Sequence, residues 1–260
     1  MSEKRSIFEE VDIADASSKK VKNNVEIINS NKALQIWLLV LFILVAAMIV
    51  VGGLTRLTDS GLSITEWKPL TGALPPLSLE VWQLEFDKYK TIPEFSIQNK
   101  AMTLSEFKTI YWWEWGHRQL GRVVGIVWLF GFFWLALVRK LTNLWITRSF
   151  IIGGLGGLQG AIGWWMVSSG LSGRMVDVAS YRLAVHLGLA FLILTLITWY
   201  LFQTNINDQE KIRSRRERDK SLVPLVNVLL VIVFLQMILG ALVAGIDAGR
   251  CYTDLPVRKG

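Results

Sequence analysis

Five long apolar runs constrain the fold of this chain more than any other feature of its sequence. Each is close to the roughly 20 residues that a helix needs to cross a bilayer, so together they predict five membrane-spanning helices. An all-α polytopic membrane protein follows, and a soluble enzyme is excluded. The runs lie at about 33–53, 119–138, 149–168, 183–203 and 222–246.

The distribution of basic residues indicates how these helices are oriented. The chain holds 28 Lys+Arg against 21 Asp+Glu, a formal net charge of +7, which in a soluble protein would suggest a nucleic-acid partner. Here the basic residues gather in alternate polar segments, most strongly in residues 1–32 and 204–221. By the positive-inside rule, these two segments face the cytoplasm or matrix. We therefore predict the N-terminus inside, the C-terminus outside and no role in binding nucleic acid.

We expect four regions along the chain. The long outer segment contains the spacing of a capping box, Thr103 followed by Glu106, so a helix is expected to start outside the membrane and to run to about residue 138. The regions are a disordered cytoplasmic tail (1–32), a four-helix transmembrane haem-binding bundle (33–203) with a large outer loop (54–117), a basic cytoplasmic linker (204–221), and the first helix and start of the outer loop of an incomplete second bundle (222–260).

A weak internal repeat supports the idea of two bundles. Residues 52–61, at the end of the first span, align without gaps with residues 240–249, at the end of the fifth, and four of ten positions match. Both segments are expected to leave the membrane on the outer face, which is compatible with a tandem duplication and disfavours a transporter built from inverted repeats. If the repeating unit is a four-helix bundle, the second copy has only its first helix here, and the chain is expected to be a portion of a longer protein.

Few side chains are available to bind a metal. The chain has one cysteine, Cys251, and two histidines, His117 and His186. His117 lies at the outer end of the second span and His186 a few residues into the fourth, so we expect them at the same depth. An ionisable group at that depth is costly unless it is paired or bound, which favours a functional site over two histidines in contact with interfacial water.

Haem fits this pair better than zinc does. Zinc needs three or four protein ligands, whereas haem needs only two axial ligands because its porphyrin supplies four nitrogens. We therefore predict a haem whose iron is bound by His117 and His186. Arg118, Arg122 and Arg182 could pair with the haem propionates, or could extend to the interface as arginines near helix ends commonly do.

Glu114 is the candidate catalytic residue. It precedes His117 by three positions and so lies on the same helix face. It could relay protons or stabilise positive charge beside the haem; a solvated carboxylate at the edge of an aromatic belt is the alternative.

The third span is rich in glycine, which favours close helix packing or, less often, a flat ligand. A dinucleotide-binding fingerprint is excluded there, because the place of its final glycine is taken by Gln159 and no strand precedes it.

Several motifs resemble those of the haem A synthase family. They occur in order between Gly52 and Pro256, and both histidines lie within them. The motifs are Gly52–Ser63, Trp67–Gly72, Leu74–Pro76, Trp113–Arg118, Leu120–Arg122, Leu158–Trp165, Tyr181–Gly188 and Gly240–Gly249.

This resemblance implies a membrane oxidase that converts the methyl substituent of haem O to the formyl group of haem A for cytochrome oxidase. It implies eight helices in two halves, with His117 and His186 at the ligand positions of the substrate haem and Glu114 at a functional acidic position. In the family the second half binds a haem b through another histidine pair, and this chain has no such pair.

The resemblance also implies a setting and partners. The setting is the bacterial cytoplasmic membrane or the mitochondrial inner membrane. The partners are haem O synthase, cytochrome oxidase assembly proteins and an electron acceptor. Association into a homo-oligomer is a further possibility that the resemblance leaves undecided. A non-catalytic haem-carrying assembly subunit, or a b-type electron-transfer protein, is the alternative function.

Overall fold

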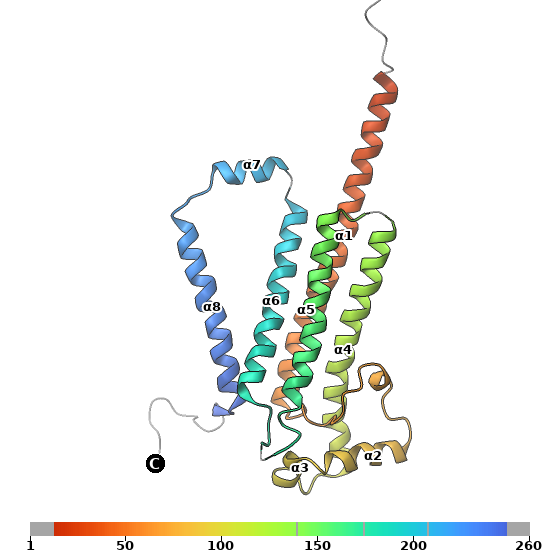
Figure 1. Ribbon diagram of the computed structural model, residues 1–260, viewed down its shortest axis with the longest axis vertical. Coiled ribbons are helices and arrows are strands. Elements are labelled where there is room, and N and C mark those ends of the chain that lie inside the picture. Colours follow the sequence, from red (N-terminus) through yellow and green to blue (C-terminus); the bar gives the residue numbers. More distant parts are fainter. Residues whose placement is uncertain (1–12, 139, 174, 207, 249–260) are drawn as a thin grey trace, which may run out of the picture.

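The computed structural model describes residues 13–138, 140–173, 175–206 and 208–248, and in this part of the chain all regular structure is helical. Five helices are long and apolar enough to cross a membrane, which confirms the predicted all-α polytopic membrane fold (Figure 1). They are α1 (Ile13–Leu57), α4 (Leu104–Leu137), α5 (Asn143–Val167), α6 (Ser180–Asn205) and α8 (Leu222–Gly245).

Four of these helices form a ring. Helix α1 packs against α4 and α6, and α5 packs against α6 and, less extensively, against α4. Helices α4 and α6 are therefore diagonal neighbours across the bundle and are not packed side by side. Helix α8 packs on α6 from outside this ring (Figure 1).

In the half of the bundle away from the histidines, tryptophan rings pack directly against glycines of neighbouring helices. The Trp37 ring fills the notch over Gly131, where an added Cβ would lie 2.1 Å from its Nε1, and this Nε1 donates to the carbonyl of Val127 at 3.0 Å. Trp128 fills the notch over Gly153 of α5 in the same way. Glycine at these positions lets the large rings pack between the backbones, so this half of the core is filled by protein side chains.

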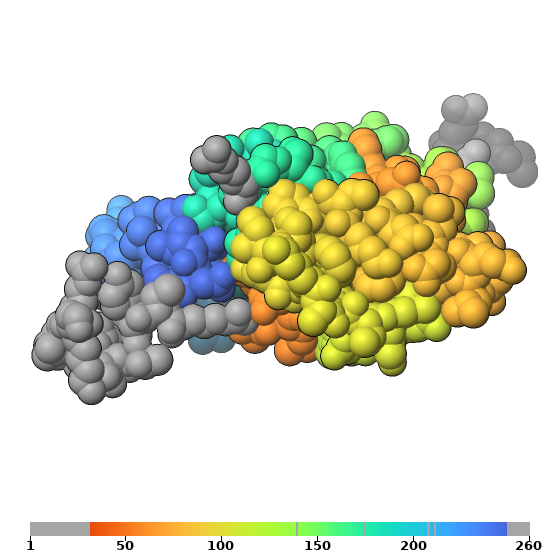
Figure 2. Space-filling model, turned by 90° about the horizontal axis from the view of Figure 1, so that it is seen from below, coloured from red at the N-terminus to blue at the C-terminus, as the bar shows by residue number. Residues whose placement is uncertain are grey.

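The opposite end carries a cap formed by the long segment between α1 and α4. Its helical elements are η1 (Thr71–Ala73), α2 (Leu79–Tyr89) and α3 (Pro93–Ile97). Together with the first turns of α4 they enclose a second, mainly aromatic core around Tyr89 and Phe107, both of which are fully buried. Viewed end-on, the cap spreads over the four-helix ring while α8 lies to one side (Figure 2).

The predicted start of α4 is confirmed. The side-chain oxygen of Thr103 accepts from the backbone N–H of Glu106, and the Glu106 carboxylate accepts from the backbone N–H of Thr103 at 2.7 Å. This capping box satisfies N–H groups at the first turn, so the helix starts in water and continues into the apolar span.

Helix α1 includes residues 13–32, which are part of the segment expected to form a disordered tail. The segment contains neither Pro nor Gly, and it adjoins an apolar helix that supplies the nucleus, so each further residue gains a backbone hydrogen bond. Residues 1–12 lie outside the described residues. The basic linker likewise contains a helix, α7 (Asp208–Arg216), which bridges α6 and α8 (Figure 1).

The ends of α1 and α8 support the internal repeat. Asp59 and Asp247 occupy the same position in the two aligned segments, and they are the two non-glycine residues with positive φ in the described part of the chain, at 48° and 51°. The Asp59 N–H donates to the carbonyl of Arg56 and the Asp247 N–H to that of Ala244, three residues earlier in each case. The two helices therefore end with the same left-handed turn, in which aspartate is one of the few tolerated side chains.

Candidate functional site

The two histidines lie on the diagonal helices, in the half of the bundle next to the cap. His117 belongs to α4 and His186 to α6, and both side chains are partly buried. In each ring the Nδ1 atom is fully buried and has no hydrogen-bond partner among the described residues. A buried ring nitrogen without a partner is costly, and a site that binds a ligand is one place where that cost is accepted.

Each imidazole packs against a glycine of a neighbouring helix. A Cβ added to Gly52 of α1 would lie 3.0 Å from Cε1 of His117, and one added to Gly163 of α5 would lie 2.9 Å from Cε1 of His186. Both distances are shorter than ordinary contacts, so neither ring could keep its position beside a larger residue. Four helices thus contribute to the site, although only two of them carry the candidate ligands.

Gln159 is a site residue that the sequence interpretation missed. Its side-chain amide donates to the backbone carbonyl of His186 at 3.0 Å and lies 3.5 Å from the ring Nε2 of the same residue. Its own Oε1 is fully buried and has no partner in the described structure. The signal in the sequence is a polar side chain in the middle of an apolar, glycine-rich span. Polar residues inside a membrane are costly and commonly functional.

Glu114 is buried, with 3% of its surface exposed, and its carboxylate is fully engaged. It accepts from the hydroxyl of Ser63 and from the backbone N–H of Ile64, both at 2.7 Å, and it pairs with Arg118, whose Nε lies at 3.0 Å. The alternative of a solvated carboxylate is therefore wrong. In this arrangement Glu114 binds the start of the outer segment to α4, one helical turn from His117.

Arg118 and Arg122 also hold the outer segment. Arg118 donates to the carbonyls of Ile64 at 2.8 Å and Glu66 at 3.1 Å, and Arg122 donates to those of Lys68 and Pro69, each at 2.9 Å. These bonds satisfy carbonyl groups in a segment without regular structure of its own. The position of this segment relative to α4 is thus set by side chains of α4.

Arg182 lies at the cap end of α6 and contacts the end of α5. Its guanidinium donates to the carbonyl of Trp165 at 2.6 Å and stacks over the indole of the same residue, 4.6 Å from the ring centroid. Nearby, the indoles of Trp67 and Trp164 stack at 6.0 Å, and the Arg118 guanidinium lies 5.8 Å from the Trp164 ring. Aromatic and cationic groups therefore converge at the cap end of the bundle, as expected for the membrane–water boundary.

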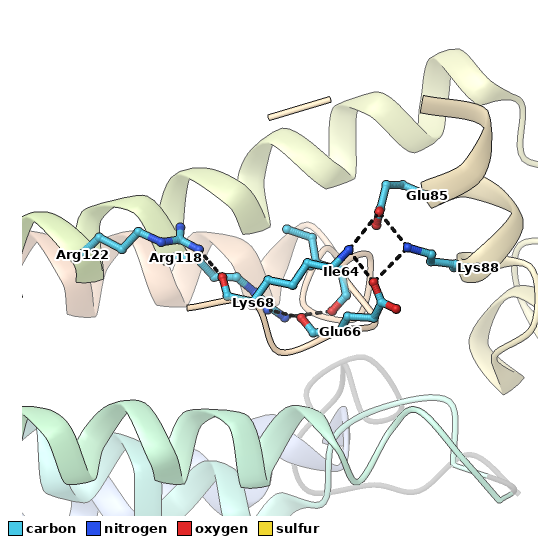
Figure 3. Close-up of polar contacts among 7 residues, drawn as sticks. All are labelled: Ile64, Glu66, Lys68, Glu85, Lys88, Arg118 and Arg122. Atoms are coloured by element: carbon cyan, nitrogen blue, oxygen red, sulfur yellow. Dashed lines mark hydrogen bonds and ion pairs between the residues drawn. The ribbon is translucent and has the colours of Figure 1, made fainter. Parts of the chain in front are cut away.

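A closed network of four charges joins the part of the outer segment that follows α1 to helix α2, within the cap (Figure 3). Glu66 and Glu85 alternate with Lys68 and Lys88, and the Lys88 ammonium lies 2.8 Å from Glu66 and 2.9 Å from Glu85. Hydrogen bonds from the two lysines lower the pKa of the Glu66 carboxyl, so Glu66 stays ionised at neutral pH.

A cleft of about 370 Å³ lies between the cap and α4. Its charged lining is formed by Lys68, Glu85, Arg118 and Arg122, and its apolar wall by residues 74–77 and Val81. Neither histidine lines it. Arg118 connects this cleft to the histidine region, because it also pairs with Glu114.

A second charged cluster connects α1, α8 and the loop before α6. Arg56 pairs with Asp177 at 2.8 Å and with Asp247 at 2.9 Å, and it donates to the carbonyl of Ala244 at 3.1 Å. Burial raises the pKa of the Asp177 carboxyl, and the nearby Asp247 acts in the same direction, against the effect of Arg56. Arg56 thus contacts the end of each copy of the internal repeat.

Comparison with known proteins agrees with these observations. Residues 35–260 match the family described as cytochrome oxidase assembly protein. A haem A synthase from Dinoroseobacter shibae is 57% identical over 264 residues, an alignment that covers 100% of this chain and 69% of that protein. One from Paracoccus denitrificans is 57% identical over 228 residues, covering 88% of this chain and 60% of that protein.

A third relative, the haem A synthase of Cereibacter sphaeroides strain ATCC 17023, is 53% identical over 261 residues, which cover 99% of this chain and 66% of that protein. The chain therefore spans about two thirds of the length of these relatives. No solved structure matches the chain. By the family match over most of its length and by its identity to these relatives, this integral, multi-pass membrane protein belongs to the haem A synthase family.

Proposed function

We propose that this chain binds haem O between His117 and His186 and takes part in oxidising its methyl substituent to the formyl group of haem A. The observation that carries the proposal is the pair itself. The only two histidines of the chain lie on diagonal helices, at the same end of the bundle, and both side chains are partly buried. Diagonal helices face each other across the centre of the bundle, so a haem held by one histidine from each would lie there.

The donor set suits haem and does not suit a protein-bound metal ion. Two imidazoles complete the coordination of an iron that already has four porphyrin nitrogens. A zinc site would need a third or fourth ligand, and no group of three His, Cys, Asp or Glu side chains with metal-binding geometry occurs among the described residues. When bound, the haem would supply the redox chemistry of the reaction, and the chain would supply ligands and position.

We propose supporting roles for the charged residues near the pair. Glu114 and Arg118 would keep the outer segment closed over the cap end of the bundle, because they bind its first residues directly. Arg122 and Arg182 stay candidates for the haem propionates. Their N–H groups donate to backbone carbonyls that the propionates would have to replace. Exclusion of water from a reacting haem is the expected benefit.

The setting that we propose follows the family. The N-terminus would face the cytoplasm, the cap would lie on the outer side, and the electrons removed from the substrate would pass to a separate acceptor. Haem O synthase and cytochrome oxidase assembly proteins are the proposed partners. A second site for haem b would need ligands other than histidines of these 260 residues, which contain only His117 and His186.

A haem-carrying assembly subunit or b-type electron-transfer protein is the competing function, since the same two histidines would serve it. Analysis of the haems extracted from the purified membrane protein separates the two. Haem A or its hydroxylated precursor would support the synthase, and protohaem alone would support the competitor.

The ligand assignment has its own test. We expect His117→Ala and His186→Ala each to abolish the low-spin visible spectrum of the bound haem while the protein still inserts into the membrane. The matched control is Thr109→Ala, an exposed polar residue of α4 whose hydroxyl donates to the carbonyl of Ser105. An unchanged spectrum in both histidine variants would remove the site.

A further inference from the structure

The two histidines lack the contact that usually orients a metal-bound imidazole. Such a ring normally donates its second N–H to a carboxylate, a carbonyl or water, which sets its rotation. In both His117 and His186 the Nδ1 atom is fully buried and unpartnered within the described structure. Some other contact must therefore set the rotation of each ring.

Glycine provides that contact at both rings, with the same geometry. From a Cβ built on Gly52, the His117 atoms Cε1, Nδ1 and Nε2 lie at 3.0, 3.5 and 3.8 Å. From a Cβ built on Gly163, the same atoms of His186 lie at 2.9, 3.5 and 3.6 Å. In each case Cε1 is the ring atom closest to the glycine, and the two ring nitrogens lie on either side of it.

This arrangement explains why Nδ1 has no partner. Because the glycine packs closely against the Cε1 corner of the ring, it limits the room beside Nδ1 for a side chain that could accept a hydrogen bond. Its own N–H and C=O groups are used within the helix, so they offer the ring nothing to bond with. Packing against the glycine therefore limits the rotation of each ring. Nε2 would be the nitrogen that binds iron, and in His186 it also lies 3.5 Å from the Gln159 amide.

We propose that Gly52 and Gly163 are positioning residues that set the orientation of the two imidazole planes by packing, in place of a hydrogen bond to Nδ1. The proposal rests on the proposed function, because it takes His117 and His186 as the haem ligands. The two glycines come from α1 and α5, the helices that separate the diagonal pair α4 and α6. The ligand helices and the orienting helices therefore alternate around the ring.

Gln159 supports this arrangement on one side. It lies on α5 one turn before Gly163, and its amide holds the backbone carbonyl of His186 at 3.0 Å. The hydrogen bond fixes the height of His186 along α5, so that its ring meets the glycine and not a neighbouring side chain. No equivalent amide contacts His117 in the described structure, where the glycine acts without it.

The chemical consequence concerns the strength of the ligands. A hydrogen bond on Nδ1 makes an imidazole more basic and strengthens its bond to the metal. Without it, both rings are weaker donors to iron than hydrogen-bonded histidines. The site would thus hold its haem by shape, with axial bonds that are weaker than in most proteins with two histidine ligands.

Each glycine has a matched control on its own helix. Gly53 is adjacent to Gly52, and Gly160 lies one turn before Gly163; a Cβ on either control would meet nothing within 4 Å. Gly52→Ala and Gly53→Ala, like Gly163→Ala and Gly160→Ala, thus change helix propensity equally and differ in the contact with a histidine.

The experiment is electron paramagnetic resonance of the ferric protein after reconstitution with haem O in detergent, because the g-values of a low-spin haem report the relative orientation of its two imidazole planes. We expect Gly52→Ala and Gly163→Ala each to shift the largest g-value, whereas the spectra of Gly53→Ala and Gly160→Ala should match the wild type. Spectra of the first two variants that match the wild type, or equal shifts in the controls, would overturn the proposal.

Two further measurements distinguish a failure of this proposal from a failure of the proposed function. Loss of haem by Gly52→Ala or Gly163→Ala supports the proposal if the variant stays monodisperse and as thermally stable as its control; loss of haem with unfolding overturns it, because the glycine would then serve helix packing. A wild-type protein that shows no low-spin haem with two imidazole ligands would refute the proposed function itself.

Discussion

At the scale of single residues, Glu114 joins the start of the outer segment to α4. The Ser63 hydroxyl, the Ile64 N–H and the Arg118 guanidinium all converge on one buried carboxylate. Sequence spacing placed Glu114 on the face of His117 and left its role open. Only the fold brings Ser63 and Ile64 to it, from about 50 positions earlier in the chain.

Replacement of Glu114 should therefore loosen the cap before it affects any chemistry. Glu114→Ala leaves three buried donors without their acceptor, and we expect a loss of about 3 kcal/mol, the lower end of the range for breaking a buried ion pair. Glu114→Gln keeps an acceptor for Ser63 and Ile64, so its stability should lie between those of the wild type and the alanine variant. Thermal unfolding and limited proteolysis of residues 58–103 measure the effect; an alanine variant as stable and as resistant as the wild type would contradict it.

Glu94 in α3 gives the cap a pH dependence. It is buried, with 3% of its surface exposed, and burial, helped by the nearby Asp177 and Glu114 carboxylates, raises its pKa from 4.5 to about 8. Between these values the folded protein keeps a proton that the unfolded chain has released, so the free energy of unfolding falls as the pH rises from about 4.5 to about 8.

We therefore expect the cap to be more stable at pH 6 than at pH 9, and Glu94→Gln to remove most of this difference, because the amide stays neutral. Tryptophan fluorescence during denaturation at the two pH values, which includes the buried Trp82 of α2, would measure it. The same pH dependence in the glutamine variant as in the wild type would assign the effect to other groups.

At the scale of helices, glycine has two different tasks along the same bundle. Near the cap it faces the histidines, and at the other end it makes room for tryptophan rings. Glycine content alone predicted close approach by another helix or by a flat ligand, and it did not separate the two tasks. The identity of the neighbour decides which task applies, and that neighbour lies on another helix.

Gly131→Ala should destabilise the bundle because its Cβ would lie 2.1 Å from Trp37 Nε1 and would displace that ring from the Val127 carbonyl. Overpacking of this kind costs about 1–3 kcal/mol. Gly125→Ala, on the same helix with nothing within 4 Å of the added Cβ, is the control. Thermal denaturation in detergent should show a lower midpoint for Gly131→Ala only, and equal midpoints for both variants would refute this account.

Helix positions were largely predictable because they depend on local patterns. The five spans and the start of α4 follow from apolar length and from a capping box, both of which act over a few turns. Residues 13–32 were not predicted as helix, since polar composition was taken as a sign of disorder although the adjoining span extends the helix through them.

At the scale of the whole molecule, the charged cluster around Arg56 links parts of the chain that are far apart in sequence. It joins the end of α1 to Asp177 and to the end of α8, 121 positions and more along the chain. Because α8 otherwise packs mainly on α6, Arg56 adds a second point of attachment at the cap end. The two copies of the repeat therefore meet through their equivalent terminal turns.

The sequence by itself determined the membrane class, the number of spans, the helix that rises into the cap and the two histidines that could bind a haem, because each depends on local composition or on a count of residues. The tertiary structure alone decided that the histidines lie on diagonal helices, that Gly52 and Gly163 face them, and that Glu114 is buried. These features arise from contacts between helices, and a helical sequence repeats similar faces every few residues, so its own pattern does not specify which residue of another helix each face will meet.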